Sequence, residues 1–232
     1  MLPARILWRR TRIGAAAVLV LALIALLAWL IAVNWRPDAK AFPNQGIDVG
    51  DAQGAIDWWK VKANPDIGFA YARATIGADG RDRSFAANWR GMYAVAMPRG
   101  AIHIFSLCQL AADQAGNFVK TVPRSDDQLP MALDLDFDPA CAARPERKVV
   151  LNEISRFLAG VEAPMGKHAI LRVSKAFEAQ YRVSEAIARP LWSVQPFFPP
   201  DYFDKAWTMW QSSPFRRIEG VPGAVNWDVM VK

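Results

Sequence analysis

An alternating run of acidic and apolar residues, Leu133-Asp134-Leu135-Asp136-Phe137-Asp138, carries the clearest chemical signal in this sequence. Successive side chains of a β-strand point to opposite faces, so a strand here places the three aspartates on one face. Neighbouring carboxylates raise one another's pKa, and one can hold a proton while another stays ionised. That division suits acid/base cleavage of a glycosidic bond. The alternatives are an exposed edge strand and a divalent-cation site.

Three other segments place polar side chains between apolar neighbours in the same way. Asp48 lies between apolar residues in the segment 46–50, and His103 is flanked by isoleucines. Tyr71 and Arg73 share one face of their segment, and a buried arginine there would need carboxylates as partners. A single Asp is often a turn or cap residue, and a lone His is more often a hydrogen-bonded core group than a catalyst.

Aromatic and amide side chains also lie together late in the chain. Trp192 and Trp210 are on predicted strands, near Gln195 and Gln211. Because sugar rings stack their apolar faces on aromatic rings, we expect these two tryptophans to wall a sugar-binding subsite. Most of the tryptophans after the N-terminal segment are expected to pack in the core or against helices.

These residues need a scaffold of strands and helices. Eight short apolar runs predict strands, at 46–50, 67–74, 99–105, 131–137, 168–173, 190–195, 206–211 and 224–229. Three-to-four spacing of apolar residues predicts helices at 84–97, 110–122, 146–161 and 175–187, with a short one at 53–63. This alternation favours an α/β fold, a modified TIM-like barrel of about eight strands and five helices. In such a barrel the acids lie at the carboxyl ends of the strands.

An uncharged apolar segment precedes the barrel. The 21 residues 13–33 are long enough, at about 1.5 Å per residue, to cross a hydrocarbon core as one helix. Arg5, Arg9, Arg10 and Arg12 precede this segment, so residues 1–12 are expected to form a basic cytoplasmic tail. Residues 34–45 read as an extended linker, and 46–232 as the barrel. The alternative is a cleaved signal peptide, whose apolar core is usually about 7–15 residues.

Composition narrows the class of protein further. The net charge of +6 includes Arg5, Arg9, Arg10 and Arg12; without these four of the 28 basic residues, 24 remain against 22 acidic ones. Such a balance gives no reason to expect nucleic acid as a partner. Two cysteines and two histidines predict neither a metal site nor a cofactor. We expect a single-pass protein of the cytoplasmic membrane, monomeric, with its barrel on the periplasmic or extracellular side.

Taken together, the ordered motifs resemble glycoside hydrolase family 25, the Chalaropsis-type N-acetylmuramidases. The matching pieces include Gly46-Ile47-Asp48-Val49, Phe69-Ala70-Tyr71, Leu133-Asp134-Leu135-Asp136, Pro190-Leu191-Trp192 and Trp210-Gln211-Ser212-Ser213. The resemblance implies a barrel that cleaves the β-1,4 bond between N-acetylmuramic acid and N-acetylglucosamine in the glycan strands of peptidoglycan. It maps the catalytic acids onto Asp48, Asp134 and Asp136.

The sequence departs from the family pattern at several positions. Asp136 stands where the family has the glutamate taken as proton donor, and Asn226 where it has an aspartate, with Asp228 two residues on. Ile76 and Ile102 replace a usual Glu and Tyr. These changes favour an alternative, a catalytically impaired peptidoglycan-binding module. A third option is a membrane scaffold for a protein partner, and nothing in the sequence indicates the surface it would use. Tyr71, Arg73, His103, Trp192, Gln195, Trp210, Gln211 and Asn226 are the expected substrate-binding residues.

The two cysteines follow consecutive strands of the predicted barrel. Cys108 and Cys141 come three and four residues after Phe105 and Phe137, respectively. Adjacent parallel strands bring both cysteines to one rim, and an exported domain permits a disulfide between them. Two free thiols are the alternative.

Overall fold

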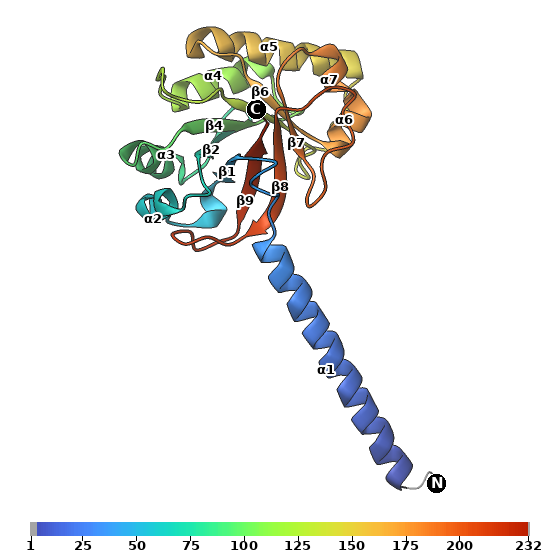
Figure 1. Ribbon diagram of the computed structural model, residues 1–232. Coiled ribbons are helices and arrows are strands. Elements are labelled where there is room, and N and C mark those ends of the chain that lie inside the picture. The colour runs from blue at the N-terminus through green and yellow to red at the C-terminus, as the bar shows by residue number, and fades with distance from the viewer. Residues whose placement is uncertain (1–3, 232) are drawn as a thin grey trace. The chain divides into compact units, whose positions relative to one another are not determined.

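A closed barrel of eight strands forms the core of the computed structural model, which describes residues 4–231 (Figure 1). The strands are β1 (Asn44–Val49), β2 (Phe69–Ile76), β4 (Arg99–Ile104), β5 (Ala132–Leu135), β6 (Ile170–Ser174), β7 (Leu191–Val194), β8 (Met209–Arg216) and β9 (Val225–Met230). They pair in the order β1-β9-β8-β7-β6-β5-β4-β2, and pairing of β1 with β2 closes the barrel. The expected fold class and all eight predicted strands are confirmed.

Strand direction is uniform except at one place. The pairs β1–β2, β2–β4, β4–β5, β5–β6, β6–β7 and β7–β8 are parallel, whereas β9 is antiparallel to both β8 and β1. A short connection suffices between β8 and β9 because antiparallel strands need no crossover. The additional strand β3 (Gly80–Arg81) forms a small hairpin with the end of β2 and was not predicted.

Helices surround most of the barrel (Figure 1). They are α2 (Trp58–Ala63), α3 (Phe85–Ala94), α4 (Ala111–Thr121), α5 (Arg147–Met165), α6 (Lys175–Tyr181) and α7 (Val183–Ala186). The segment 175–187 was predicted as one helix, but it divides at Arg182, whose φ of 45° is left-handed. A residue in that conformation ends the hydrogen-bonded ladder of α6, so a second short helix follows.

The core has an inner and an outer layer because both faces of a barrel strand are buried. Tyr71, Trp192 and Met209 belong to the inner layer, together with Phe69, Ile102, Ala132 and Ile170. Gly100 gives the Tyr71 ring its space, since a Cβ there would lie 2.2 Å from the ring. In the outer layer the strands meet the buried faces of the helices, such as Phe118 of α4 and Phe157 of α5.

The segment before β1 packs on the barrel, although residues 34–45 were expected to be an extended linker. Phe42 stacks on Trp207 with centroids 6.1 Å apart and meets Trp210 edge-on at 5.8 Å. The buried Gln45, already in β1, donates to the carbonyl of Phe42 and accepts from the indole of Trp227. No helix follows β7, β8 or β9 within the described residues, so this segment covers tryptophans that would otherwise be exposed.

The chain divides into two compact units after Trp35, and the N-terminal helix α1 (Ala4–Asn34) belongs to the first. Its stretch Arg12–Asn34 has a mean hydropathy of 3.0 and is long and apolar enough to cross a membrane. The helix begins nine residues before the predicted anchor, so the described part of the basic tail is helical as well. Residues 1–3 of that tail, and Lys232, lie outside the described residues.

Candidate active site

A cation at the centre of the barrel joins two of the predicted acids. Arg172 of β6 places Nη1 2.6 Å from Oδ2 of Asp134, on the neighbouring strand β5. Its Nη2 lies 4.0 Å from Oδ2 of Asp48, on β1. In the strand order, β1 and β6 are separated by three strands on either side, so Arg172 reaches across the barrel interior. The predicted meeting of acids from separate strands therefore occurs, with an arginine between them.

The three side chains of this cluster are almost completely buried. The exposed fractions are 12% for Arg172, 8% for Asp48 and 10% for Asp134. Burial raises the pKa of Asp134, and the charge and hydrogen bonds of Arg172 act in the opposite direction. Burial lowers the pKa of Arg172, but Asp134 and Asp48 outweigh it and raise that pKa. The guanidinium is therefore a permanent charge that favours the ionised form of Asp134.

Two polar residues of β9 complete the cluster around Asp48. Asn226 donates from Nδ2 to Oδ1 of Asp48 at 2.8 Å, across the β1–β9 pair. Asp228 is fully buried, and burial raises its pKa well above the usual value. Repulsion from Asp48 raises the pKa of Asp228 further, while Arg172 opposes the rise. Asn226 thus contacts a catalytic candidate directly, and its neighbour Asp228 adds a fourth carboxyl group to the region.

Asp136 occupies a different environment from the buried acids. Strand β5 ends at Leu135, so the expected alternation does not extend to Asp136 and Asp138. Asp136 is exposed, and its Oδ1 accepts from the amide of Phe137 at 2.8 Å. It is near enough to Asp134 to raise that residue's pKa. Asp138 lies in a turn and accepts from the amide of Ala140, so the three aspartates do not share one strand face.

Trp192 and Trp210, the two tryptophans predicted to wall a sugar-binding subsite, are both buried. Trp192 faces the barrel interior, where the Arg172 guanidinium is 5.5 Å from its ring centroid, but it has no exposed surface. Trp210 is on the outside of the barrel against Phe42 and donates to the carbonyl of Gln195 at 2.5 Å. Neither ring offers a face to a sugar. Trp192 forms the floor of the cluster, and Trp210 covers the outer surface.

The two glutamines divide between the cluster and the loop after β7. Gln211 accepts a hydrogen bond from the guanidinium of Arg172, so it belongs to the cluster. Gln195 is partly buried, and its amide donates to the carbonyl of Pro199 at 3.1 Å. Only Gln211 therefore helps to hold the acids in place.

Tyr71 and Arg73 do not pair with the acids as expected. Tyr71 is fully buried, and its hydroxyl donates to the carbonyl of Pro130, which precedes β5 at the amino-terminal end of the barrel. Burial raises the pKa of Tyr71, and the charge of Asp228 adds to this effect. Arg73 is partly exposed, and Arg172 takes the role of carboxylate partner that the sequence had suggested for Arg73.

His103 faces the helices rather than the barrel interior, which corrects the expected substrate contact. Its ring is fully buried, with Nδ1 2.7 Å from the Thr75 hydroxyl and Nε2 3.1 Å from Oε1 of Gln114. It stacks on Phe157 of α5 at 4.6 Å. Burial lowers the pKa of His103 to about 4, although the Gln114 bond opposes this. The neutral ring is a structural link between β4 and α4.

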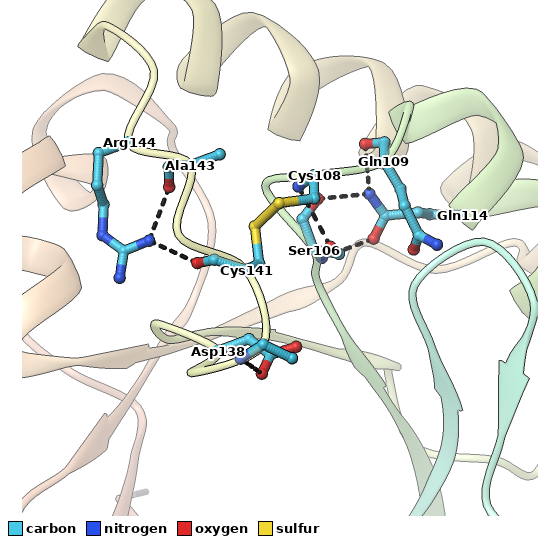
Figure 2. The surroundings of a disulfide bond; sticks show 9 residues. Ser106, Cys108, Gln109, Gln114, Asp138, Cys141, Ala143 and Arg144 are labelled. Carbon is cyan, nitrogen blue, oxygen red and sulfur yellow. Dashed lines mark hydrogen bonds between the residues drawn. A yellow bond between two sulfur atoms is a disulfide. The ribbon is translucent and has the colours of Figure 1, made fainter.

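A disulfide joins Cys108 and Cys141, whose Cα atoms are 5.9 Å apart. Figure 2 shows it between the loops that follow β4 and β5, beside the hydrogen bonds of Gln114 with Ser106. Since Gln114 also contacts His103, the disulfide lies next to the network on the helix side of the barrel.

Arg172, Asp228 and a group of rim aromatics were not among the predicted site residues. Arg172 had the same signal as Asp48, a charged residue between apolar neighbours in a strand. Phe197 and Phe198 follow β7, Phe215 lies near the end of β8, and the rings of Phe197 and Phe215 stack with centroids 6.0 Å apart. Phe198 is 71% exposed and Phe215 37%, so apolar ring surface is accessible after these strands. Among the described residues, no group of three metal-ligating side chains is placed to hold an ion.

Comparison with known proteins gives a consistent result. The family model of glycosyl hydrolases family 25 matches residues 47–221. YegX of Escherichia coli K12 is 32% identical over 189 residues, covering 79% of this chain and 68% of that protein. Lysozyme M1 of Streptomyces globisporus is 28% identical over 199 residues, covering 78% and 66%. The crystal structure of a bacterial lysozyme from Streptomyces coelicolor superimposes with a TM-score of 0.74, at 28% identity, and covers 82% of this chain and 92% of its own.

Proposed function

The chain belongs to glycosyl hydrolases family 25, and from that premise we propose that it is a membrane-anchored lysozyme that cleaves peptidoglycan. The bond proposed is the β-1,4 link from N-acetylmuramic acid to N-acetylglucosamine. The observation that carries this proposal is the meeting of Asp48 and Asp134 from separate strands around Arg172. The relatives named lysozyme support the same substrate class.

The environments of the acids suggest how they divide the work. Asp134 is almost completely buried and its carboxyl group is paired with Arg172, so a leaving oxygen has little access to it. Asp136 is exposed beyond the end of β5, where a leaving oxygen can reach it. In the proposed reaction Asp136 protonates that oxygen as the bond to the anomeric carbon breaks. Asp134 and Asp48 stabilise the positive charge on the sugar.

Hydrolysis is completed when the anomeric carbon gains an oxygen. Either water or the substrate's own acetamido group attacks this carbon first, and in both routes the hydroxyl of one water finally replaces the broken bond. The proton lost by water returns to the carboxylate of Asp136, which restores the starting state. The exposed aromatic rings at Phe198 and Phe215 are suited to hold adjacent sugars by their apolar faces.

The shorter acid favours a second candidate, a binding module of reduced or no activity. Aspartate places its carboxyl group about 1–1.5 Å further back than glutamate, by standard bond lengths. A displacement of about 1 Å can lower a rate on the order of a hundredfold. Within the described residues, the carboxyl group of Asp136 accepts a hydrogen bond from the adjacent amide of Phe137, and this bond does not move the group toward the substrate.

Release of reducing ends from purified peptidoglycan by the full-length protein tests the two candidates. For the lysozyme we expect release, lowered about a hundredfold to ten-thousandfold by Asp136→Asn. Asp138→Asn is the matched control and leaves the rate unchanged, because Asp138 is held in a turn. Sedimentation with peptidoglycan, no release by the native protein and release by Asp136→Glu would instead establish the binding module.

The proposed location is the cytoplasmic membrane, with the barrel exported. The apolar helix α1 and the arginines before it support an uncleaved anchor, and the disulfide supports an oxidising compartment. Membrane fractionation and N-terminal sequencing of the purified protein test this. We expect membrane-bound protein that begins near residue 1, whereas a soluble protein that begins after residue 33 would identify a cleaved signal peptide.

A further inference from the structure

Asp228 is a fully buried acid for which the mechanism above gives no task. It lies on β9, two residues after Asn226. Asp228 pairs with Gly46, two residues before Asp48 on β1, so it lies deeper in the barrel than Asp48. Neither of its oxygens has a hydrogen bond of normal geometry within the described residues. The Trp192 indole is nevertheless close enough to lower the pKa of Asp228 somewhat. A buried carboxyl group in this position is costly unless its charge is removed or compensated.

Asp48 also has a buried oxygen that lacks a hydrogen bond within the described residues. Its Oδ1 accepts from Asn226, but its Oδ2 is buried without a hydrogen bond, and Arg172 is 4.0 Å away. Asp48 and Asp228 are within hydrogen-bonding reach of each other. Two ionised carboxylates can only accept, so they repel; one proton between them turns one into a donor and satisfies an oxygen on each.

The surroundings identify which of the two acids holds the proton. The charged and titratable groups that face Asp228 are Asp48 from β1, Tyr71 from β2 and Arg172 from β6. Arg172 is already bound to Asp134 and Gln211, while Asp48 has Asn226 to stabilise its negative charge. The Trp192 indole lowers the pKa of Asp228, but burial and repulsion from Asp48 outweigh it, so Asp228 is the member of the pair that is better neutral.

We propose that Asp228 is protonated at neutral pH and donates a hydrogen bond to Asp48, as a positioning residue for that carboxylate. Asp48 is then held by donors on both oxygens, Asn226 on one and Asp228 on the other. It keeps its negative charge and a fixed orientation toward the sugar. The functional part of this inference rests on the proposed catalytic role of Asp48, whereas the protonation itself does not.

Infrared spectroscopy of the full-length protein in a carbonyl-free detergent tests the protonation. A protonated carboxyl group has a carbonyl band distinct from those of carboxylates and amides. We expect this band in the native protein at pH 7, its loss in Asp228→Asn, and its retention in the matched amide variant Asp134→Asn. Absence of the band from the native protein, or its loss in Asp134→Asn, would overturn the proposal. Neither result depends on whether the protein is a lysozyme.

Cleavage of peptidoglycan tests the positioning role separately. Asp228→Leu removes the donor to Asp48, and we expect a rate about ten- to a hundredfold lower, with the loss in kcat rather than KM. Asp228→Asn keeps a donor of the same size and should recover about tenfold of that loss. Equal rates for the leucine and asparagine variants would refute positioning by hydrogen bonding. If Asp228→Leu does not fold, the infrared comparison still decides the protonation.

Discussion

Two buried polar clusters lie on opposite faces of the same barrel wall. His103 pairs in register with Leu133, and the next position of β4 pairs with Asp134, so the clusters are one residue apart along the strand. On the helix side, both nitrogens of His103 have partners. On the inner side, buried oxygens of Asp48, Asp134 and Asp228 have no hydrogen bond within the described residues.

This difference separates structure from function. A buried polar group whose hydrogen bonds are all made contributes rigidity and offers nothing to a ligand. A buried group with unused oxygens carries a free-energy cost, which folding retains only where the group has another task. The function proposed above accordingly places the reaction at the inner cluster, although His103 is the residue type more often associated with catalysis.

Loss of the central cation should have the largest effect on stability. Arg172→Met leaves Asp134 buried without its partner, and we expect the free energy of unfolding to fall by about 3–5 kcal/mol at pH 7. The folded-state pKa of Asp134, already raised, rises further, so protonation stabilises the variant and its deficit shrinks as the pH falls toward the ordinary carboxyl pKa. Urea unfolding at pH 7 and pH 5 measures this. Arg73→Met is the control, and an equal deficit there would show that the ion pair contributes little.

Removal of the disulfide should weaken the helix-side cluster and spare the inner one. The bond closes a loop with a sequence separation of 33 residues, and loop-closure entropy predicts a loss of about 3–4 kcal/mol in Cys108→Ser/Cys141→Ser. Thermal unfolding with and without reductant measures the loss, because the reduced native protein should match the double variant. The infrared band assigned to Asp228 should remain; its disappearance would mean that the two clusters are coupled.

Acid should destabilise the helix-side cluster through His103. The folded-state pKa of about 4 is below the ordinary value of 6.5, so the unfolded chain takes up the proton first. Stability therefore falls as the pH drops from 6.5 to about 4, by at most about 3 kcal/mol. His103→Gln should unfold with a smaller pH dependence in this window. An unchanged slope would show that His103 is not the group responsible.

The inner cluster should give a pH dependence of the opposite sign. A raised folded-state pKa means that native Asp228 binds its proton more tightly than the unfolded chain, so its contribution is lost as the pH rises through that value. Asp228→Asn cannot lose a proton and should gain stability relative to the native protein, by at most about 1.4 kcal/mol per pH unit. Urea unfolding from pH 5 to pH 8 measures this gain; a constant difference would contradict a shared proton.

Identical local patterns had opposite outcomes in these two regions. Asp48 and His103 each lie between apolar residues, yet Asp48 faces the interior and His103 the helices. Alternation assigns side chains to two faces but does not say which face is inside, because both faces of a barrel strand are buried. For the same reason the sequence indicated Arg73, and not Arg172, as the partner of the carboxylates. Trp210 was likewise expected to bind substrate, although it lies outside the barrel.

The alternating sequence pattern also failed to predict where a strand ends. The alternation continues through Asp138, but β5 stops at Leu135, the last residue that pairs with β6. A strand lasts only as long as its neighbours supply hydrogen-bond partners, which come from distant parts of the sequence. Asp136 is exposed for that reason, and the proposed reaction uses this exposure to bring its carboxyl group to the leaving oxygen.

The sequence by itself determined the eight barrel strands, the apolar N-terminal helix and the family, because periodicity and motif order are local properties of the chain. Tertiary structure alone decided which acids became neighbours, which arginine lies between them and which of the polar residues are turned away from the interior. The physical reason is that closure of the barrel joins β1 to β2 and brings β6 opposite β1. Contacts across that interior depend on the whole circle of strands, which no single segment encodes.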